Sequence, residues 1–374
     1  MEISELGEFG LIRRLAKTIQ PTNAETIQGI GDDCAILNCP DGTDQLVTTD
    51  MLMEGIHFDL TYMPMHTLGY KSAQVNFSDV YAMGGMPRQI TVSIAVSGRL
   101  SVEDLEQFYA GLALACQEHQ VDIVGGDTTT SVTGLAISIT CIGTVPHGQA
   151  IRRSTARPTD LICVSGDLGA AYMGLQLLER EKEVYYGQLR DLQERLRQAQ
   201  SQEGHQQQQE HIAQQIRQLD FQPDFAGREY LLQRQMQPQA RRDIILTLQQ
   251  HHLRPTSMID ISDGLSSELL HICHLSHVGC RVYEERIPLD YQTAAMAEQL
   301  NLNVTTCALN GGEDYELLFT LPISDHEALR QIPSIHVIGH ITQPELGAAL
   351  ITRDGNEFEL KAQGWQPFAD DWQD

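Results

Sequence analysis

The segment GIGDDCAI, residues 29–36, places two glycines around Ile30 and two acids directly after them. Glycines at this spacing allow a tight turn in which the backbone approaches a ligand, as in loops that bind phosphate. Phosphate loops usually add a lysine, whereas this turn adds Asp32 and Asp33. The segment therefore predicts a turn at Gly31 in which Asp33 meets a metal ion, with Asp32 either a second ligand or the cap of the turn.

Acids recur beside Gly, Ser or Thr at the ends of apolar segments along the chain. The segments are VTTD, NFSD, IVGGDTTT, MIDISDG and LNGGEDYEL, and their acids are Asp50, Asp79, Asp127, Asp260, Asp263, Glu313 and Asp314. Hard cations such as Mg²⁺ take carboxylate oxygens together with the phosphates of a substrate. Together with the first turn, these segments predict a site for phosphate-bound metal ions.

An Asp next to Gly or Ser is also common in turns and helix N-caps, and each acid taken alone has that alternative reading. Asp263, in SDGLSSELL, fits a cap of the following helix as well as it fits a ligand. Asp260 lies on the same strand face as Ser262 and has no such simple structural role. The recurrence of the pattern, rather than any one acid, favours the metal site.

Composition excludes several classes of function. The chain has 374 residues, of which 41% are hydrophobic, and a net charge of −25, which argues against a nucleic-acid-binding face. There is no apolar run of about 18 residues and no apolar signal-peptide core near the N-terminus, so we expect neither a membrane span nor secretion. The eight cysteines are scattered without a C-x-x-C pair, and we expect them to be reduced in a cytoplasmic protein.

The hydrophobic pattern alternates between strands and amphipathic helices, which predicts an α/β (α+β) fold of two domains. Strands are predicted at residues 45–52, 88–97, 121–127, 135–145, 160–166, 258–262, 315–322 and 336–342. A helix is predicted from Val102 to His119. The unperiodic, Pro- and Arg-containing segment 145–160 predicts a boundary near residue 148, with an N-terminal domain over 1–148 and a C-terminal domain over 149–374.

Residues 179–222 differ from the rest because they are rich in Gln, Glu and Arg. Apolar residues recur there at helical spacing, first at Tyr185, Leu189, Leu192 and Leu196, then at Ile212, Ile216 and Leu219. Because Gly204 lies between the two stripes, the pattern predicts an antiparallel helical hairpin inserted into the second domain. A disordered glutamine-rich tract is the alternative. The hairpin has no cluster suited to catalysis, so we expect a role in interaction.

Seven motifs in order resemble the thiamine-monophosphate kinase family. They are GEFGLI, GIGDDCA, TTDMLMEGIHF, NFSDVYAMGGMP, IVGGDTT, DISDGLSSEL and GGEDYELLFT, within residues 6–179 and 223–368. The resemblance implies the two-domain fold shared with aminoimidazole ribonucleotide synthetase and selenophosphate synthetase, with the N-terminal domains paired in a homodimer. It also implies the final step of thiamine diphosphate biosynthesis. In that step ATP and thiamine monophosphate give thiamine diphosphate and ADP by direct in-line transfer, assisted by several Mg²⁺ ions.

The resemblance implies a role for individual residues, matched motif by motif. The implied metal ligands are Asp33, Thr48, Thr49, Asp50, Asp79, Asp127, Asp260 and Asp263. The implied ATP contacts are Gly126, Asp127, Arg153 and Ser262, and the implied contacts with thiamine monophosphate are His57, Glu313 and Trp365. No side chain is assigned as a general base, because the acceptor phosphate is largely ionised near neutral pH and the site acts by positioning and charge neutralisation.

Two features depart from the family pattern. They are the 179–222 insertion and the linker STARPTD, residues 154–160, which has fewer glycines and changes the surroundings of Arg153. Rival functions remain. A selenophosphate synthetase would need a reactive Cys in an N-terminal loop, a hydrogenase-maturation relative would need a C-terminal Cys, and a purine-pathway synthetase would use a purine precursor. A non-catalytic acidic protein would bind Ca²⁺ or a partner through the hairpin, without binding nucleotide.

Overall fold

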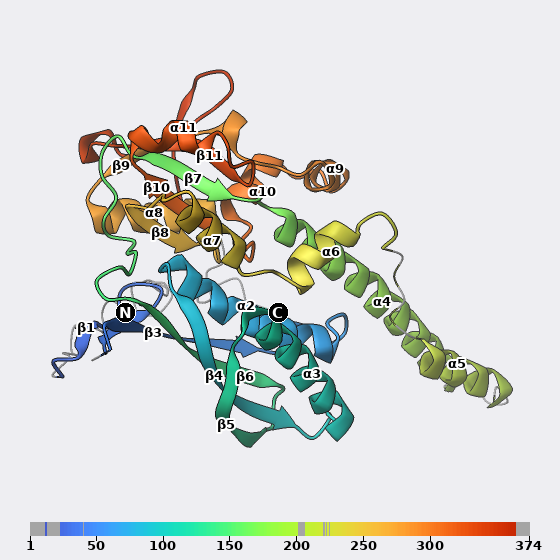
Figure 1. The fold of residues 1–374 in the computed structure, drawn as a ribbon. Coiled ribbons are helices and arrows are strands. Elements are labelled where there is room, and N and C mark those ends of the chain that lie inside the picture. Colours follow the sequence, from blue (N-terminus) through green and yellow to red (C-terminus); the bar gives the residue numbers. More distant parts are fainter. Residues whose placement is uncertain are drawn as a thin grey trace.

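The computed structural model describes residue 12 and residues 23–39, 41–200, 206–219, 221, 223 and 225–363. Two β-sheets with helices packed against them form the body of the molecule, and a long helical hairpin projects from it (Figure 1). The first sheet lies within residues 26–146 and the second within residues 161–359, so the chain completes one sheet before it begins the other. This arrangement agrees with the predicted α/β (α+β) fold.

The first sheet has six strands and is antiparallel except at one edge. Its spatial order is β1 (Thr26–Gln28), β2 (Ala35–Asn38), β3 (Thr43–Met53), β6 (Ala136–Pro146), β4 (Met86–Ser97) and β5 (Asp122–Ser131). The edge strand β5 runs parallel to β4, and helix α3 (Val102–His119) makes the crossover between them. Helix α3 begins and ends as predicted: Ser101 and Asp104 form a capping box at its start, and Gln120 adopts a left-handed conformation at its end.

The second sheet has seven strands and the same mostly antiparallel character. Its spatial order is β13 (Glu357–Glu359), β12 (Ala348–Ile351), β9 (Gly279–Tyr283), β11 (Ile335–Thr342), β7 (Leu161–Ser165), β10 (Leu317–Leu321) and β8 (Ser257–Asp260). The eight predicted strands correspond to β3 to β8, β10 and β11. Strands β1, β2, β9, β12 and β13, of three to five residues each, were not predicted.

Helix α2 (Met65–Ala82) lies at the junction between the two sheets (Figure 1). It packs against β3 and β6 on one side and against β8 on the other. Because both sides are covered, even polar side chains of this helix are buried, and they include Lys71, Asn76 and Ser78. Further helices of the body include α6 (Glu229–Met236), α7 (Arg242–Gln250), α8 (Leu265–Ser276), α9 (Tyr291–Gln299), α10 (Val304–Asn310) and α11 (His326–Leu329).

The predicted hairpin is present and is longer than the inserted segment. Helix α4 runs over Ala170–Gln200 and helix α5 over Gln206–Gln218, and the two pack together. Tyr185 of α4 meets the ring of Phe221 with their centroids 6.0 Å apart. The first third of α4 packs on the body of the protein, where Ala170, Met173 and Leu177 belong to a buried apolar cluster. Gly204, the predicted turn residue, lies outside the described residues.

One buried apolar cluster extends across both sheets. It includes Phe77 and Tyr81 of α2, Ile244 of α7 and Phe319 of β10. All eight cysteines are free thiols, and seven of them are buried. Within the described part of the chain, no helix is both long enough and apolar enough to cross a bilayer.

Candidate active site

Three carboxylates from distant parts of the sequence converge at the junction between the sheets. Asp33 precedes β2, Asp79 lies in the last turns of α2, and Asp260 ends β8. One oxygen of each lies within 4.8 Å of the others. We call these three residues the carboxylate cluster. It consists of oxygen donors only, which suits a hard cation such as Mg²⁺.

Hydrogen bonds fix the cluster to its supporting elements. Ser78 Oγ donates to Asp260 Oδ2 at 2.5 Å, which ties α2 to the end of β8. Thr48 Oγ1 of β3 donates to Asp79 Oδ2 at 2.5 Å. Adjacent residues of α2 therefore connect one sheet to the other, and this places Asp79 beside Asp260.

Burial and mutual repulsion make ionisation of these carboxylates unfavourable. Burial raises the pKa values of Asp33 and Asp79 well above their ordinary range, and neighbouring carboxylates raise them further. Burial and then the charge of Asp260 raise the pKa of Asp50 to about 7. Asp33 Oδ2 and Asp50 Oδ2 are buried and have no hydrogen-bond partner. Oxygens in this state are the free ligand positions that a bound metal ion needs.

Arg153 supplies positive charge at one side of the cluster. Its Nη2 lies 2.5 Å from Asp33 Oδ1, and its Nε lies 3.2 Å from Asp32 Oδ1. Asp32 also accepts hydrogen bonds from the backbone N–H of Asp33 and from Gln28 Nε2, each at 3.2 Å. Asp32 is thus a partner of Arg153. Gly31 has a φ of 135°, which only glycine adopts readily.

The linker STARPTD holds Arg153 in place despite its missing glycines. Thr155 Oγ1 donates to the carbonyl of Thr256 at 2.5 Å. Ser276 Oγ accepts from the N–H of Ala156 at 3.1 Å and donates to the carbonyl of Arg153 at 3.2 Å. The linker is therefore anchored on the second sheet and on α8, next to the cluster.

Several other predicted residues lie apart from the cluster. Thr49 is on the opposite face of β3 from Thr48 and Asp50, and its Oγ1 donates to the carbonyl of Ile139 at 3.1 Å. Gly126 and Asp127 are exposed on the edge strand β5. A Cβ at Gly126 would lie 1.8 Å from the carbonyl oxygen of Val92, so this position requires glycine.

The segment that carries Ser262 and Asp263 is positioned by Glu268. The buried Glu268 carboxylate accepts from the N–H of Asp263 at 2.8 Å and from Ser262 Oγ at 3.5 Å. Burial raises the pKa of Glu268 well above its usual range, and its Oε2 is buried without a partner. Ser262 itself is exposed and Asp263 is half-buried. Trp365, the remaining predicted residue, lies outside the described residues.

Glu313 and His57 face a second group of residues at the same junction. Glu313 Oε1 pairs with Lys71 Nζ at 2.9 Å, and Glu313 Oε2 accepts from Gln235 Nε2 at 2.6 Å. His57 Nδ1 accepts the N–H of Met53 at 3.0 Å. In the neutral ring this leaves the proton on Nε2, which can donate to a ligand. Glu313 has a φ of 56°, a left-handed value that costs a residue other than glycine some backbone strain.

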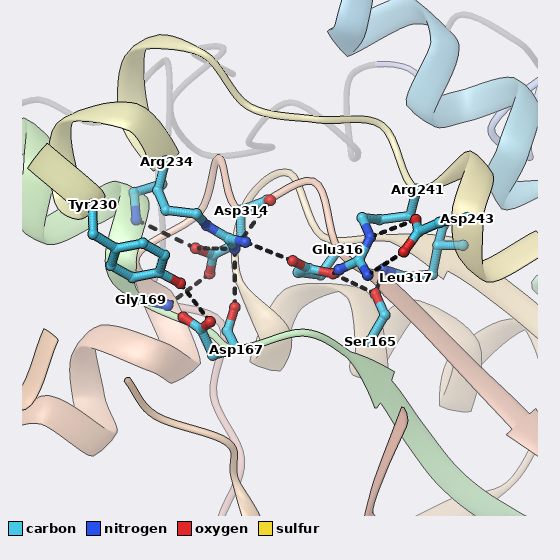
Figure 2. Close-up of polar contacts among 11 residues, drawn as sticks. Ser165, Asp167, Gly169, Tyr230, Arg234, Arg241, Asp243, Asp314, Glu316 and Leu317 are labelled. Carbon is cyan, nitrogen blue, oxygen red and sulfur yellow. Dashed lines mark hydrogen bonds and ion pairs between the residues drawn. The ribbon is translucent and has the colours of Figure 1, made fainter. Parts of the chain in front are cut away.

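The loop that carries Glu313 is held by buried ion pairs. Arg234 and Arg241 approach Glu316 from two sides (Figure 2), and Arg234 Nη1 lies 2.6 Å from Glu316 Oε1. Asp314 accepts the N–H of Gly169 at 2.8 Å. Burial raises the pKa of Asp314 to about 6, although the charge of Arg234 opposes the shift.

Sequence reasoning missed Lys71, Glu268 and the arginines around Glu316. Lys71 precedes Asp79 by eight residues in a helical pattern, which places both near one face of α2. Lys71 is the one basic Lys or Arg side chain of α2 and was therefore a usable signal. Glu268 has the spacing of an ordinary helix residue, and only its burial reveals its role.

Comparison with known proteins places the chain in a family. Residues 31–145 match the family described as AIR synthase related protein, N-terminal domain. The thiamine-monophosphate kinase of Aquifex aeolicus is 32% identical over 369 residues, which cover 98% of this chain and all of that protein. The chain belongs to the thiamine-monophosphate kinase family. The enzyme of the same name from Escherichia coli (strain K12) is 32% identical, with 97% of this chain and 98% of that protein covered.

Solved structures of the thiamine-monophosphate kinase family share the fold. One, described as AaThiL complexed with AMPPCP and TMP, has a TM-score of 0.76 and 30% identity, with 98% of this chain and 99% of that chain covered. Another, from Aquifex aeolicus, has a TM-score of 0.69 and 28% identity, with 96% and 100% covered. The predicted family, the kinase class and the two-sheet α/β fold are confirmed. Hydrogenase maturation protein HypE, at 18% identity and a TM-score of 0.58, shares the fold alone.

Proposed function

We propose that this protein transfers the γ-phosphoryl group of ATP to thiamine monophosphate, giving thiamine diphosphate and ADP, the final step of thiamine diphosphate biosynthesis. The observation that carries the proposal is the carboxylate cluster of Asp33, Asp79 and Asp260. It occurs in a chain that is 30% identical, over nearly its whole length, to a kinase structure holding AMPPCP and TMP. We infer the acceptor, thiamine monophosphate, from the name of the relatives, and metal-assisted phosphoryl transfer from the carboxylate cluster.

The cluster fits Mg²⁺ because its donors are oxygens and two neighbouring carboxylate oxygens are buried without partners. We propose Asp33, Asp50, Asp79 and Asp260 as principal ligands. Thr48, Thr49, Asp127 and Asp263 remain predicted ligands. Bound Mg²⁺ would neutralise the negative charge of the phosphate oxygens. That charge matters, because two unit charges about 4 Å apart repel by roughly 4 kcal/mol at an intermediate dielectric.

The side chains of this protein position the reactants. Arg153, which is held beside Asp33, is oriented to meet the phosphates of ATP, and Ser262 is exposed beside the same site. His57 offers its Nε2 proton to the acceptor phosphate. Glu313 is held by Lys71 and Gln235, so its partly exposed carboxylate keeps one orientation toward the acceptor. We keep Trp365 as a predicted contact of the thiamine ring.

We further propose a homodimer formed along β5. Residues 122–130 of this edge strand are all exposed, among them Val124 at 57% of its surface. Exposed strand edges with apolar residues favour pairing with another chain. Gly126 and Asp127 lie on the same edge, so we place their contacts with ATP next to the dimer contact. The domain boundary near residue 148 and a cytoplasmic location also stay proposals.

The experiment that tests the function is an assay of ADP release with purified protein, ATP, Mg²⁺ and thiamine monophosphate. Phosphorus NMR should show the resonances of thiamine diphosphate in addition to those of ADP. Turnover with a purine precursor but not with thiamine monophosphate would overturn the proposal. Binding of Ca²⁺ without binding of an ATP analogue, measured by calorimetry with and without Mg²⁺, would support the non-catalytic alternative.

A further inference from the structure

The base of the helical hairpin contacts the segment that carries His57. This segment, residues 54–64, joins β3 to α2. Tyr62 Oη donates to Glu179 Oε1 at 2.7 Å, and Lys182 Nζ pairs with Asp59 Oδ2 at 3.3 Å. Glu179 and Lys182 lie three residues apart on α4 and therefore share one face of that helix.

Lys182 is the centre of this contact. Its ammonium pairs with Glu179 at 2.5 Å as well as with Asp59, and it lies 5.8 Å from the centroid of the Tyr62 ring. Only 17% of its side chain is exposed. The exposed pair between Arg195 and Asp191, further along α4, has a 3.7 Å separation and both side chains more than half exposed. Exposed pairs of that kind contribute little. The partly buried contact at Lys182 restrains the segment together with the Tyr62–Glu179 hydrogen bond and the 3.1 Å contact between Thr61 Oγ1 and Tyr186 Oη.

Short hydrogen bonds hold Asp59 and His57 within the same segment. Asp59 Oδ1 accepts the N–H of Thr61 at 2.7 Å, and the backbone N–H of Met63 donates to the carbonyl of Asp59 at 2.9 Å. On the other side, the N–H of His57 donates to the carbonyl of Met53 at 2.9 Å. Only Phe58 separates His57 from Asp59, so we expect a shift of Asp59 to alter the position of the imidazole.

The other end of α4 is held by the neighbour of Glu313. Asp314 accepts the N–H groups of Gly169 and Ala171 at 2.8 Å and 3.4 Å, where α4 begins (Figure 2). Twelve residues separate Ala170 from Lys182, which corresponds to about 18 Å of helix. One rigid helix thus connects the loop of Glu313 to the segment of His57.

We propose that α4 sets the distance between His57 and Glu313, and that Glu179 and Lys182 are positioning residues for thiamine monophosphate. The inference rests on the proposed function, which places His57 and Glu313 at the acceptor. The base of the helical insertion then belongs to the acceptor site, whereas the outer turns of the insertion do not.

The test compares Lys182→Met with Arg195→Met, a matched variant on the exposed part of the same helix. In Lys182→Met, the KM for thiamine monophosphate should rise by about fivefold to tenfold, as expected for the loss of one partly buried charged pair. The KM for ATP and kcat should stay within about twofold, and Arg195→Met should match the wild type. Combining Asp59→Asn with Lys182→Met should add little to either single change.

Hydrogen exchange gives a readout that needs no turnover. Lys182→Met should speed amide exchange within residues 57–63, and Arg195→Met should not. An unchanged KM for thiamine monophosphate, or a parallel rise in both KM values with a lower Tm, would overturn the positioning role. If the wild type did not convert thiamine monophosphate at all, the proposed function would fail, whereas unchanged exchange in Lys182→Met would reject the restraint itself.

Discussion

Arg153 Nη2 lies 2.5 Å from Asp33 Oδ1, although 120 residues separate the two in the sequence. Asp33 therefore belongs at once to the carboxylate cluster and to an internal ion pair. Burial raises the pKa of Asp33, and the charge of Arg153 opposes that shift. The protein thus carries one fixed positive charge at the edge of a site that otherwise gathers negative charge.

Replacing Arg153 with methionine should leave Asp32 and Asp33 without their cation. Removing one partner of a buried pair destabilises proteins by about 3–5 kcal/mol, so Tm should fall by several degrees in EDTA. The fall should be smaller with Mg²⁺, because the metal replaces part of the lost charge. We also expect a large rise in the KM for ATP. Arg330→Met, which alters an exposed pair with Glu327, is the control. An equal loss of Tm with and without Mg²⁺ would contradict the shared role of Asp33.

Asp79→Asn should lower kcat by at least about 100-fold if Asp79 holds a metal ion. Its Tm in EDTA should stay the same or rise, because the substitution removes one of several buried like charges. Thermal melting and the ADP assay measure the two effects, and Asp191→Asn on the exposed hairpin is the control. Wild-type turnover in Asp79→Asn would rule out Asp79 as a ligand.

The effect of Mg²⁺ on stability should depend on pH. The folded-state pKa values of Asp33, Asp50, Asp79 and Asp260 all lie above the usual carboxyl value, with that of Asp50 at about 7. Without metal, the folded protein binds more protons than the unfolded chain, so stability contributed by these groups is lost as pH rises from about 4 through about 7. Mg²⁺ needs the ionised carboxylates, so it should raise Tm more at about pH 8 than at about pH 6. A shift that is independent of pH would exclude these acids as the metal site.

Two deletions should distinguish the contribution of the hairpin base to activity from that of the outer turns of the hairpin. Replacing residues 189–219 with a short Gly-Ser linker should leave kcat and both KM values within about twofold, because the described hydrogen bonds and ion pairs of these residues lie within the hairpin itself. The antiparallel helices allow this connection, since Tyr185 already meets Phe221. Deleting residues 179–222 also removes Glu179 and Lys182, and it should raise the KM for thiamine monophosphate. Equal kinetics for the two deletions would count against the contact.

Val124→Asp should disrupt the proposed dimer. Val124 is the third residue of the exposed strand β5, and a charge there opposes burial against a second copy. Sedimentation equilibrium should show a dimer for the wild type and a monomer for the variant. Asp122→Asn, at the end of the same strand, should remain dimeric. A monomeric wild type would remove this proposal without affecting the assignment to the kinase family.

Most of the fold could be predicted from the sequence because its local hydrophobic patterns are strong. The alternation in β3, β4 and β6 and the helical spacing of α3 are long enough to distinguish strand from helix, so those elements were predicted closely. Strands such as β9 and β12 have five and four residues and depend on pairing with each other, which is a long-range contact. Their sequences carry too little periodicity to show it. The same limit hid Glu268, whose burial depends on the packing of α8.

The acidic turns could be predicted from the sequence alone, because turn geometry and metal chemistry restrict which residue types can occur in them. The turn at Gly31 is present and Asp33 belongs to the cluster, whereas metal binding by Asp33 stays a prediction. Which acids meet was decided only by the tertiary structure. It brings Asp33, Asp79 and Asp260 within 4.8 Å, leaves Asp127 on an exposed edge, and turns Thr49 to the opposite face of β3. The reason is physical: convergence depends on how α2 packs between two sheets, and no local spacing records contacts between residues more than a hundred positions apart.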